Sequence, residues 1–326
     1  MNINFEKNLE SKHQLKFNTN GKFKILMMSD IQEPLNIDSR TLPAINKLID
    51  HTKPDFIMLC GDNCDHNSVT NSEKLKAYLN MVTEPMESRK IPWAHVFGNH
   101  DHDIEIDDIE KTKFYEKYPY CISKHSEDIY GTTNYVLPVR ASKSDDIAFN
   151  IWAMDTNDLI KDSDIKLQNN YFNLNRPINS AAWDIIHFDQ IMWYYLTSKE
   201  FEKRYNKKIH GFMFQHIALW EFQHIVDNME LTNGSGNTGE RMQLGAYNSG
   251  MFSAICERGD ILAISAGHSH EDDFSGELAG ITLSLDGSAG YSPYGIDDIR
   301  GGRVFEIDEN DIENFKTYMV YYKDIK

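Results

Sequence analysis

Short apolar runs recur along the chain, and polar side chains of the kinds that bind metal ions follow each of them directly. The runs are typical of buried strands and have the sequences KFKILMMS, DFIMLC, WAHVF, GFMFQ and ILAISA. After them come Asp30-Ile31-Gln32, Gly61-Asp62-Asn63, Gly98-Asn99-His100-Asp101, His216 and Gly267-His268-Ser269-His270. A ligand at a strand end is held on a rigid edge, and several such edges can converge on one point. Together these segments predict a two-metal hydrolase site.

The first part of the chain alternates predicted strands with predicted helices. Strands are expected over 23–29, 55–60 and 92–97, and the amphipathic stretches 40–52 and 71–88 between them predict helices. A β-α-β-α-β order implies parallel strands joined by helical crossovers, and hence an α/β sandwich. Side chains at the carboxyl ends of such strands lie where open α/β sheets usually bind ligands.

The rest of the chain is less regular but continues the alternation. Further strands are expected over 134–139, 148–155, 207–215, 261–266, 280–285 and 303–307, and further helices over 188–205 and 245–257. The polar stretch 156–182 predicts a long surface excursion, and residues 231–240 predict a flexible surface loop or a substrate lid. Because no repeat or linker separates these parts, we expect one domain over 1–326, which includes a polar leader over 1–21.

Composition narrows the class of protein without choosing a function. Of the 326 residues, 40% are hydrophobic and 25% are charged, as in ordinary soluble globular proteins. The formal net charge of -17 argues against a nucleic-acid partner, which needs clustered Lys and Arg. A phosphorylated small molecule stays compatible with this charge, because two divalent cations would reverse it locally.

The cysteines and the N-terminal residues exclude other classes. Cys60, Cys64, Cys121 and Cys256 form no C-x-x-C pair, so we expect buried or incidental thiols, with Cys64 near enough to Asp62 to touch the site. The first residues contain no apolar signal core, and no apolar run approaches the length of a membrane span. We therefore expect a cytoplasmic protein that has no membrane segment.

Phosphate-ester hydrolysis explains why these residue types would gather. Two cations about 3.5–4 Å apart supply a shared hydroxide and positive charge for the phosphoryl oxygens, while a separate acid protonates the leaving oxygen. Asp62 is the candidate bridge, because a charged carboxylate has two oxygens. One ion would be bound by Asp62 with Asp30, Gln32 and His270, and the other by Asp62 with Asn99, His216 and His268. His100 would act as the general acid, and Asp101 could orient it.

In this order the motifs resemble those of the calcineurin-like metallophosphoesterase superfamily. The shared pattern is Asp-x-His/Gln, Gly-Asp, Gly-Asn-His-Asp/Glu, a lone His and Gly-His-x-His, and it extends from about Lys22 to Asp308. The resemblance agrees with the ligand assignments above and implies a β-sandwich flanked by helices, in four layers α/β/β/α. The segments DIIHFDQIMWY and GHSHEDDFSG…GYSPYG…RGGRVFEID are similar to the small, purple-acid-phosphatase-related branch of that superfamily.

Three positions depart from the pattern of the superfamily. Gln32 stands where most members have His, and its neutral oxygen donor favours Mn or Fe while leaving Zn open. Asp-x-Gln also resembles the manganese-dependent ADP-ribose/CDP-alcohol diphosphatases. Asp65 stands where purple acid phosphatases have a Tyr ligand, so we expect no purple ferric chromophore. Ser269 replaces a common Asp at a position that is not a ligand.

Other chemically capable residues are better explained as structural. The remaining histidines are expected at the surface, in the core or in packing contacts, with a small exception for His66 and His102 because they are close in sequence to the ligands. Tyr291 and Tyr294 could line the organic part of a substrate, although packing within their loop is the simpler explanation.

The favoured function is a dinuclear phosphomonoesterase that acts on a phosphorylated small molecule or a phosphoprotein, with a metal-bridging hydroxide as nucleophile. Gln32 keeps a phosphodiesterase or a nucleotide-diphosphate-type pyrophosphatase open as an alternative. A catalytically silent, metal-binding interaction protein is a third hypothesis, although the Asn99-His100 pair argues against it. The sequence leaves open the oligomeric state, the metal and the physiological substrate, whose choice we expect to depend on 156–182 and 231–240.

Overall fold

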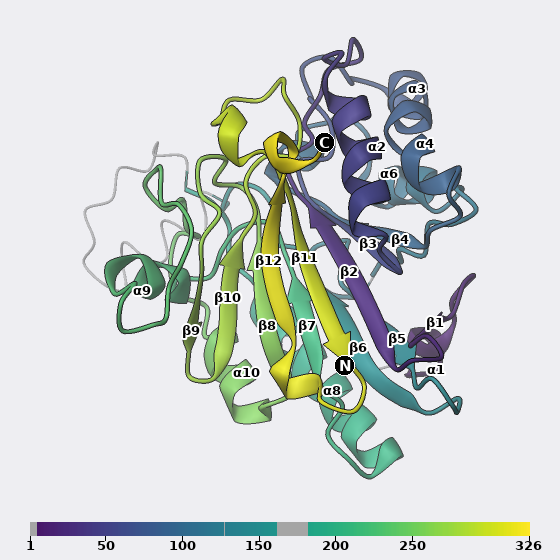
Figure 1. The fold of residues 1–326 in the computed structure, drawn as a ribbon, viewed down its shortest axis with the longest axis vertical. Coiled ribbons are helices and arrows are strands. Elements are labelled where there is room, and N and C mark those ends of the chain that lie inside the picture. Colours follow the sequence, from purple (N-terminus) through teal and green to yellow (C-terminus); the bar gives the residue numbers. More distant parts are fainter. Residues whose placement is uncertain (1–4, 127, 162–181) are drawn as a thin grey trace.

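Two β-sheets lie face to face in the computed structural model, which describes residues 5–126, 128–161 and 182–326 (Figure 1). The larger sheet has seven strands in the spatial order β1 (Leu15–Lys16), β5 (Tyr135–Arg140), β6 (Ile147–Ala153), β7 (Gly211–Phe214), β8 (Ile261–Ala266), β10 (Ile281–Leu285) and β9 (Ser275–Leu278). The smaller sheet has five, in the order β12 (Lys316–Tyr321), β11 (Gly301–Asp308), β2 (Lys22–Met28), β3 (Phe56–Cys60) and β4 (Trp93–Val96). Strands β2, β3 and β4 are parallel, as are β6, β7, β8 and β10. Their carboxyl ends therefore meet at one end of each sheet.

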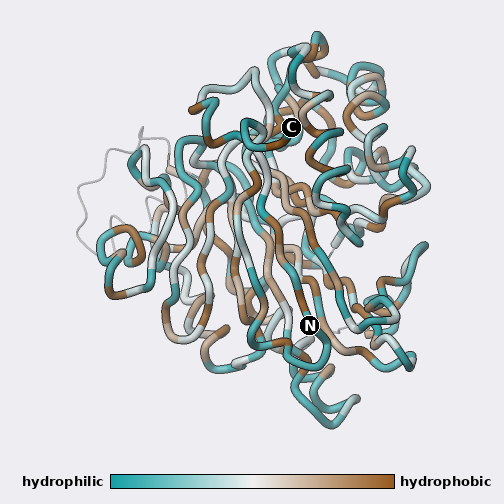
Figure 2. The backbone as a smooth tube through the Cα atoms, in the orientation of Figure 1, coloured by the Kyte–Doolittle hydropathy of each residue, from teal (hydrophilic) through white to brown (hydrophobic). Residues whose placement is uncertain are grey.

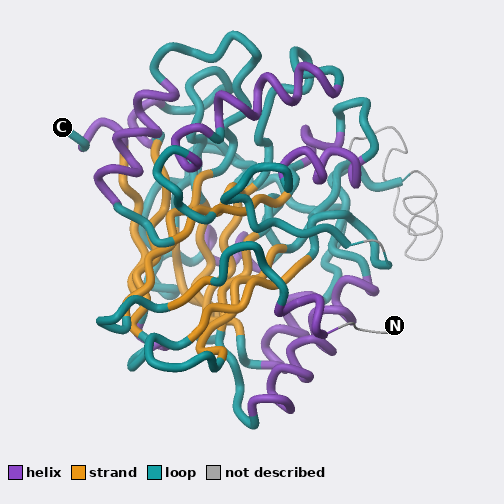
Figure 3. Tube along the Cα trace, turned by 90° about the vertical axis from the view of Figure 1, so that its right-hand side faces the viewer, coloured by secondary structure: helices purple, strands orange, loops and turns teal. Residues whose placement is uncertain are grey.

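Helices cover the outer face of each sheet. The five-stranded sheet packs against α2 (Thr41–Thr52), α3 (Ser72–Val82), α4 (Glu84–Glu87) and α6 (Asp108–Tyr115). The seven-stranded sheet packs against α1 (Phe5–Leu9), α8 (Phe188–Tyr205), α9 (Glu221–Asp227) and α10 (Met251–Arg258). Three short 3-10 helices, η1 (Asp297–Ile299), η2 (Ile312–Asn314) and η3 (Tyr322–Asp324), complete the C-terminal part. The predicted four-layer α/β/β/α architecture is confirmed, with the strands at the centre of the molecule and helices around them (Figure 3).

Strand β2 shows why an almost continuous apolar run produces this architecture. Because successive side chains point to opposite faces, Ile25 and Met27 enter the layer between the two sheets, while Leu26 and Met28 pack against the helices. Burying each such side chain contributes roughly 1.5–3 kcal/mol. The hydrophobic stretches accordingly follow the strands, and the peripheral loops are mainly hydrophilic (Figure 2).

Some predicted helices and strands differ from those observed. The helix expected over 71–88 is divided into α3 and α4, and the helix expected over 245–257 begins only at Met251. The strand expected over 207–215 is confined to Gly211–Phe214. By contrast, the ranges predicted for α8 and β8 are those observed.

The segments without strong patterns are also placed by contacts with the core. The leader predicted over 1–21 contains α1 and β1, and Phe5, Leu15 and Phe17 are buried. In the excursion predicted over 156–182, residues 162–181 lie outside the described part of the chain. Among the helices of the described residues, none combines the length and hydrophobicity that a membrane span requires.

Candidate metal centre

The predicted ligands gather because strand ends from both sheets converge. Asp30, Asp62 and Asn99 follow β2, β3 and β4 of the smaller sheet, each within three residues of the strand end. His216 and His268 follow β7 and β8 of the larger sheet in the same way. The sandwich therefore brings two sets of loops together, although their residues are far apart in the sequence.

Two groups of buried side chains have donor atoms close enough to hold a metal ion. One group is Asp30, Asp62 and His270, and the other is Asp62, His216 and His268, with all donor atoms of a group within 4.8 Å of one another. Asp62 is common to both groups, which is the geometry a bridging carboxylate requires. The distance from His216 Nε2 to Asp62 Oδ2 is 3.3 Å, and that from His270 Nε2 to Asp30 Oδ1 is 3.1 Å.

The backbone at four of the predicted ligands is in the left-handed region. The φ angles are 53° at Asp30, 36° at Gln32, 46° at Asp62 and 72° at His268. Each such residue costs on the order of 1–3 kcal/mol and persists only where its surroundings fix it. Here the backbone N–H of Asp30 donates to the Gly61 carbonyl at 3.1 Å, and that of Gln32 donates to the Asp62 carbonyl at 2.9 Å. The loops at the site are therefore held in strained conformations by bonding to each other.

Gly98 has a steric reason for being glycine. A Cβ atom at this position would lie 2.3 Å from Asp62 Oδ1 and 2.8 Å from His216 Cδ2. The glycine thus allows the loop after β4 to approach the shared carboxylate. In the sequence the same residue could have been only the end of a strand.

Charge and burial act in opposite directions on the ionisable groups. Burial alone would lower the pKa of His216, but the carboxylates of Asp62 and Asp30 outweigh it and raise this pKa to about 9. Burial would raise the pKa of Asp62, but His216 outweighs it, and the net direction is downward. Burial lowers the pKa of His268 to about 3, with His216 adding to the decrease. A neutral imidazole is the form that binds a metal.

The residues present fit two divalent cations, because several buried donors have no hydrogen-bond partner among the described residues. These atoms include both side-chain polar atoms of Asn99 and His268 Nε2. Asp30 Oδ1 and His216 Nε2 contact only members of the two donor groups. The opposite ring nitrogen, Nδ1, contacts the Cys60 carbonyl at 2.8 Å in His216. In His270 the Nδ1 atom contacts the Tyr294 carbonyl at 2.9 Å. Such contacts fix the ring and leave Nε2 for a metal.

A cavity of about 440 Å³ opens over the shared carboxylate. Gln32 and His100 line it together with Asp62, His268 and His270, so every predicted site residue except Asn99, Asp101, His216 and Asp30 reaches its wall. Those four are buried.

The cavity also has walls that sequence reasoning did not assign. Trp183 contacts His268 edge-to-face with ring centroids 4.7 Å apart, and Gln243 lies in the same wall. Tyr294 stacks on His270 with centroids 4.1 Å apart and lines the cavity, as the less favoured interpretation of that residue had it. A lone Trp or Gln in a polar stretch carries no periodic signal, so Trp183 and Gln243 could not have been found.

Asp101 lies in a different environment from the one expected. Its carboxylate accepts hydrogen bonds from the backbone N–H of Gly98 at 2.9 Å and from the Asn63 side chain at 2.9 Å, and burial raises its pKa to about 6. It thus ties the loop after β3 to the loop after β4. The carboxylate that contacts the His100 ring is Asp103, whose Oδ2 lies 2.9 Å from His100 Nδ1.

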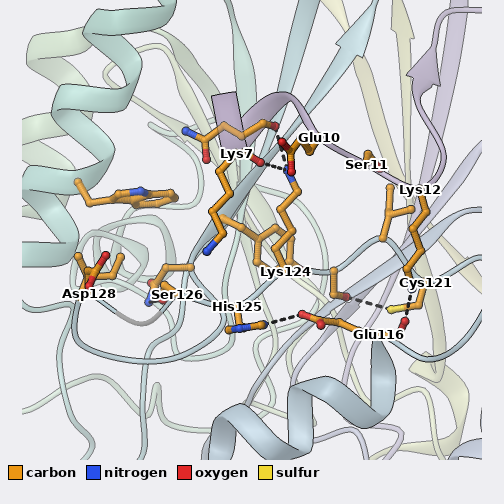
Figure 4. Close-up of a pocket in the computed structure, with 17 residues that line it drawn as sticks. Lys7, Glu10, Ser11, Lys12, Glu116, Cys121, Lys124, His125, Ser126 and Asp128 are labelled. Carbon is orange, nitrogen blue, oxygen red and sulfur yellow. Dashed lines mark hydrogen bonds and ion pairs between the residues drawn. The ribbon is translucent and has the colours of Figure 1, made fainter. Parts of the chain in front are cut away.

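A second, larger cavity of about 640 Å³ lies between α1 and residues 121–126 and 128–129 (Figure 4). Two of its basic groups have partners: Lys124 donates to the Lys7 and Asn8 carbonyls, and His125 Nδ1 lies 2.7 Å from Glu116 Oε1. None of its lining residues belongs to a metal-type donor group among the described residues. The larger cavity is therefore not where the predicted chemistry gathers.

Both the fold and this site define a two-metal phosphoesterase class. Residues 23–272 match the calcineurin-like phosphoesterase family, and the chain belongs to this family. Membership in a family with dimetal phosphatases implies two metal ions.

Individual relatives match this chain over most of its length. The chain is 28% identical to probable inactive purple acid phosphatase 14 of Arabidopsis thaliana in an alignment of 321 positions that covers 87% of this chain and 74% of that protein. It is also 28% identical to probable inactive purple acid phosphatase 29 of the same plant over 318 residues, covering 87% and 76% of the two chains. A solved dimetal phosphatase from Danio rerio has the same fold, with a TM-score of 0.56, 12% identity and coverage of 92% and 99%.

Proposed function

We propose that the protein is a dinuclear metal-dependent phosphomonoester hydrolase. The observation that carries the proposal is the position of Asp62, which belongs to both groups of metal-type donors. The buried side-chain atoms of Asn99 and His268 that have no hydrogen-bond partner support it, because such atoms are costly to bury unless a ligand satisfies them.

When bound, two divalent ions would supply a hydroxide nucleophile at neutral pH and positive charge for the phosphoryl oxygens. The chain supplies the acid. The His100 backbone N–H donates to Asp62 Oδ1 at 2.9 Å, which fixes the residue beside the shared carboxylate, and its ring lines the cavity. In ester hydrolysis water is added across the bond between phosphorus and the ester oxygen, and His100 would give the proton on Nε2 to that oxygen as the bond breaks. The products are an alcohol and inorganic phosphate.

The lining of the cavity supports a monoester over a diphosphate. Among the described residues of this lining, the ionisable groups are carboxylic acids, histidines and Tyr294, and no Lys or Arg is present. A second phosphate would therefore meet no Lys or Arg side chain in this lining. Trp183 and Tyr294 offer aromatic surfaces to the organic part of a phosphorylated small molecule or of a phosphoprotein.

The donor set also bears on the metal. Gln32 lines the cavity and would contribute a neutral oxygen, which favours Mn or Fe. Asp65 occupies the position of the phenolate ligand of purple acid phosphatases, and its carboxylate accepts hydrogen bonds from Asn67 and Ser68. The protein loaded with Fe³⁺ should therefore show no visible charge-transfer band.

Metal analysis joined to a substrate comparison tests the proposal. Purified protein with Mn²⁺ is offered p-nitrophenyl phosphate, its bis-ester and ADP-ribose, while elemental analysis counts the bound ions. We expect two ions per chain and the highest kcat/KM for the monoester. A preference for the bis-ester or ADP-ribose would favour the alternative that Gln32 suggests.

The names of the Arabidopsis relatives raise a second candidate, a metal-binding protein without catalysis. In this chain the general-acid candidate and all seven predicted ligands are present. Two bound ions with no turnover on any of the three substrates would establish that candidate instead.

A further inference from the structure

A third group of imidazole and carboxylate side chains lies at the mouth of the cavity, outside the two metal-type groups. It consists of His66, His100 and Asp103, whose donor atoms lie within 4.8 Å of one another. His100 lines the cavity, and Asp103 is the residue that follows α5 (Asn99–His102). The group therefore includes the proposed general acid and two residues with no assigned role.

The two neighbours hold the His100 ring at one edge and on one face. Asp103 Oδ2 lies 2.9 Å from His100 Nδ1, and His66 stacks on His100 with centroids 4.6 Å apart and planes 17° apart. His66 Nδ1 lies 3.8 Å from the same carboxylate oxygen. The His100 side chain is 31% exposed, so without these contacts its ring would have several rotamers open to it.

Two other carboxylates near His100 accept hydrogen bonds from different groups. Asp101 accepts hydrogen bonds from Gly98 and Asn63, and Asp65 accepts them from the turn that follows it. Because Nδ1 faces Asp103, Nε2 is the ring nitrogen left for a substrate.

We propose that Asp103 and His66 are positioning residues that hold His100 with Nε2 directed at the leaving oxygen. The inference rests on the proposed function, since it assigns the support for that reaction's acid. A ring that is already held in place needs less reorientation before it can transfer a proton. Loss of a supporting side chain of this kind typically lowers activity by about 10–100-fold. A third cation held by the same trio is the competing explanation.

The leaving group separates positioning from a general structural defect. Asp103→Ala should lower kcat by about 10-fold on a primary alkyl phosphate and by less than about 2-fold on p-nitrophenyl phosphate, which needs little protonation. KM should change little, and Asp103→Asn, which can still accept a hydrogen bond, should retain part of the activity. His66→Phe, which keeps a stacked ring, should retain more activity than His66→Ala. Glu105→Gln is the matched control, because this exposed residue two positions on makes no described hydrogen bond or ion pair.

Two outcomes would overturn the inference. One is an equal loss on both esters, or a further loss when Asp103→Ala is added to His100→Ala, since residues that act together should not add. The other is the loss of one bound ion per chain in Asp103→Ala, which would assign the trio to a cation.

A readout that needs no turnover keeps this inference separate from the proposed function. In protein with ¹⁵N-labelled histidine and bound Zn²⁺, the His100 ring signals should shift in Asp103→Ala and stay in place in Glu105→Gln. If the wild-type protein hydrolyses no ester, the proposed function fails while this measurement still decides the contact. Unchanged His100 signals in Asp103→Ala would refute the positioning.

Discussion

Two clusters of aspartate and histidine in this protein differ in whether the polar atoms around them have hydrogen-bond partners. At the strand ends, His268 Nε2 and both side-chain polar atoms of Asn99 have no hydrogen-bond partner among the described residues. Behind them, His102 contacts Asp108 at 2.8 Å and Asp155 at 3.2 Å. Each ring nitrogen of His102 thus has a carboxylate.

Burial and shifted pKa values do not separate the two clusters. Burial would lower the pKa of His102, but Asp155 and Asp108 outweigh it and raise this pKa well above its usual value. The pKa of His216 is raised in the same way. The two clusters differ in that polar atoms without hydrogen-bond partners lie beside a cavity in only one of them. The comparison teaches that buried polar atoms without partners mark a functional site better than shifted pKa values do.

The cluster of His102, Asp108 and Asp155, here called the satisfied cluster, supports the backbone that carries the candidate metal site. His102 lies on α5, the helix that also carries Asn99 and His100. Its contacts tie that helix to α6 through Asp108 and to the end of β6 through Asp155. One cluster would therefore hold metal, and the other holds the helix in place.

Substitution of Asp62 is the most direct test of the difference between the two clusters, and it should have the largest effect. Asp62→Asn should reduce kcat/KM by roughly 10³-fold or more, equivalent to about 4 kcal/mol of barrier, because a neutral amide does not bridge two cations. Metal analysis should find at most one ion per chain, and thermal unfolding should show a folded protein. Two bound ions in this variant would contradict the shared role of Asp62.

Removal of the acid should have the next largest effect. His100→Ala should lower the rate on an alkyl phosphate by about 10²–10⁴-fold and the rate on p-nitrophenyl phosphate by less, because p-nitrophenolate leaves without a proton. Steady-state kinetics on both esters measure the difference. Equal losses on the two esters would refute the acid role.

A substitution in the satisfied cluster should lower the free energy of unfolding. Asp155→Asn leaves His102 with one carboxylate, and removing one partner of a buried charge pair costs about 3–5 kcal/mol. Denaturant unfolding measures this loss of free energy, and metal analysis should still find two ions. An unchanged free energy of unfolding would show that this cluster does not support the fold.

The smallest expected effect is the pH dependence of the stability that Asp155→Asn removes. The folded-state pKa of His102 is raised, so its stabilisation is fully present below its unfolded pKa of about 6.5 and is lost as pH rises through the folded-state value. The pKa of Asp155 is lowered, because His102 and the Thr132 and Thr133 amides outweigh burial, so its contribution is present above about pH 3.8 and is lost as pH falls through the folded-state value.

The difference in stability between wild type and Asp155→Asn should therefore be largest between about pH 4 and 6.5. Above that range it should shrink with rising pH by at most about 1.4 kcal/mol per pH unit. Unfolding curves collected across pH for both proteins measure it. A difference that is constant from pH 5 to alkaline pH would contradict the His102 contribution.

The differences between predicted and observed helices have local and distant causes. Pro85 has no N–H to continue the helix, so α3 ends and α4 begins at this point, a break that the sequence contains. The late start of α10 has a distant cause, because the Ala246 N–H donates to the Trp183 carbonyl and Gly250 is left-handed at the helix start. Strands β9 and β12 are at sheet edges and are only partly buried, so their pattern is weak.

The sequence by itself determined the strands, their parallel order and the candidate ligand residues at their ends, because strand periodicity and strand-end chemistry are local properties. The tertiary structure decided which side chains meet: that Asp62 is common to both donor groups and that Asp103, not Asp101, contacts His100. It also decided that Trp183 and Gln243 complete the cavity wall. Contacts of this kind depend on how distant loops pack, and a linear pattern of hydrophobic and polar residues carries no record of that packing.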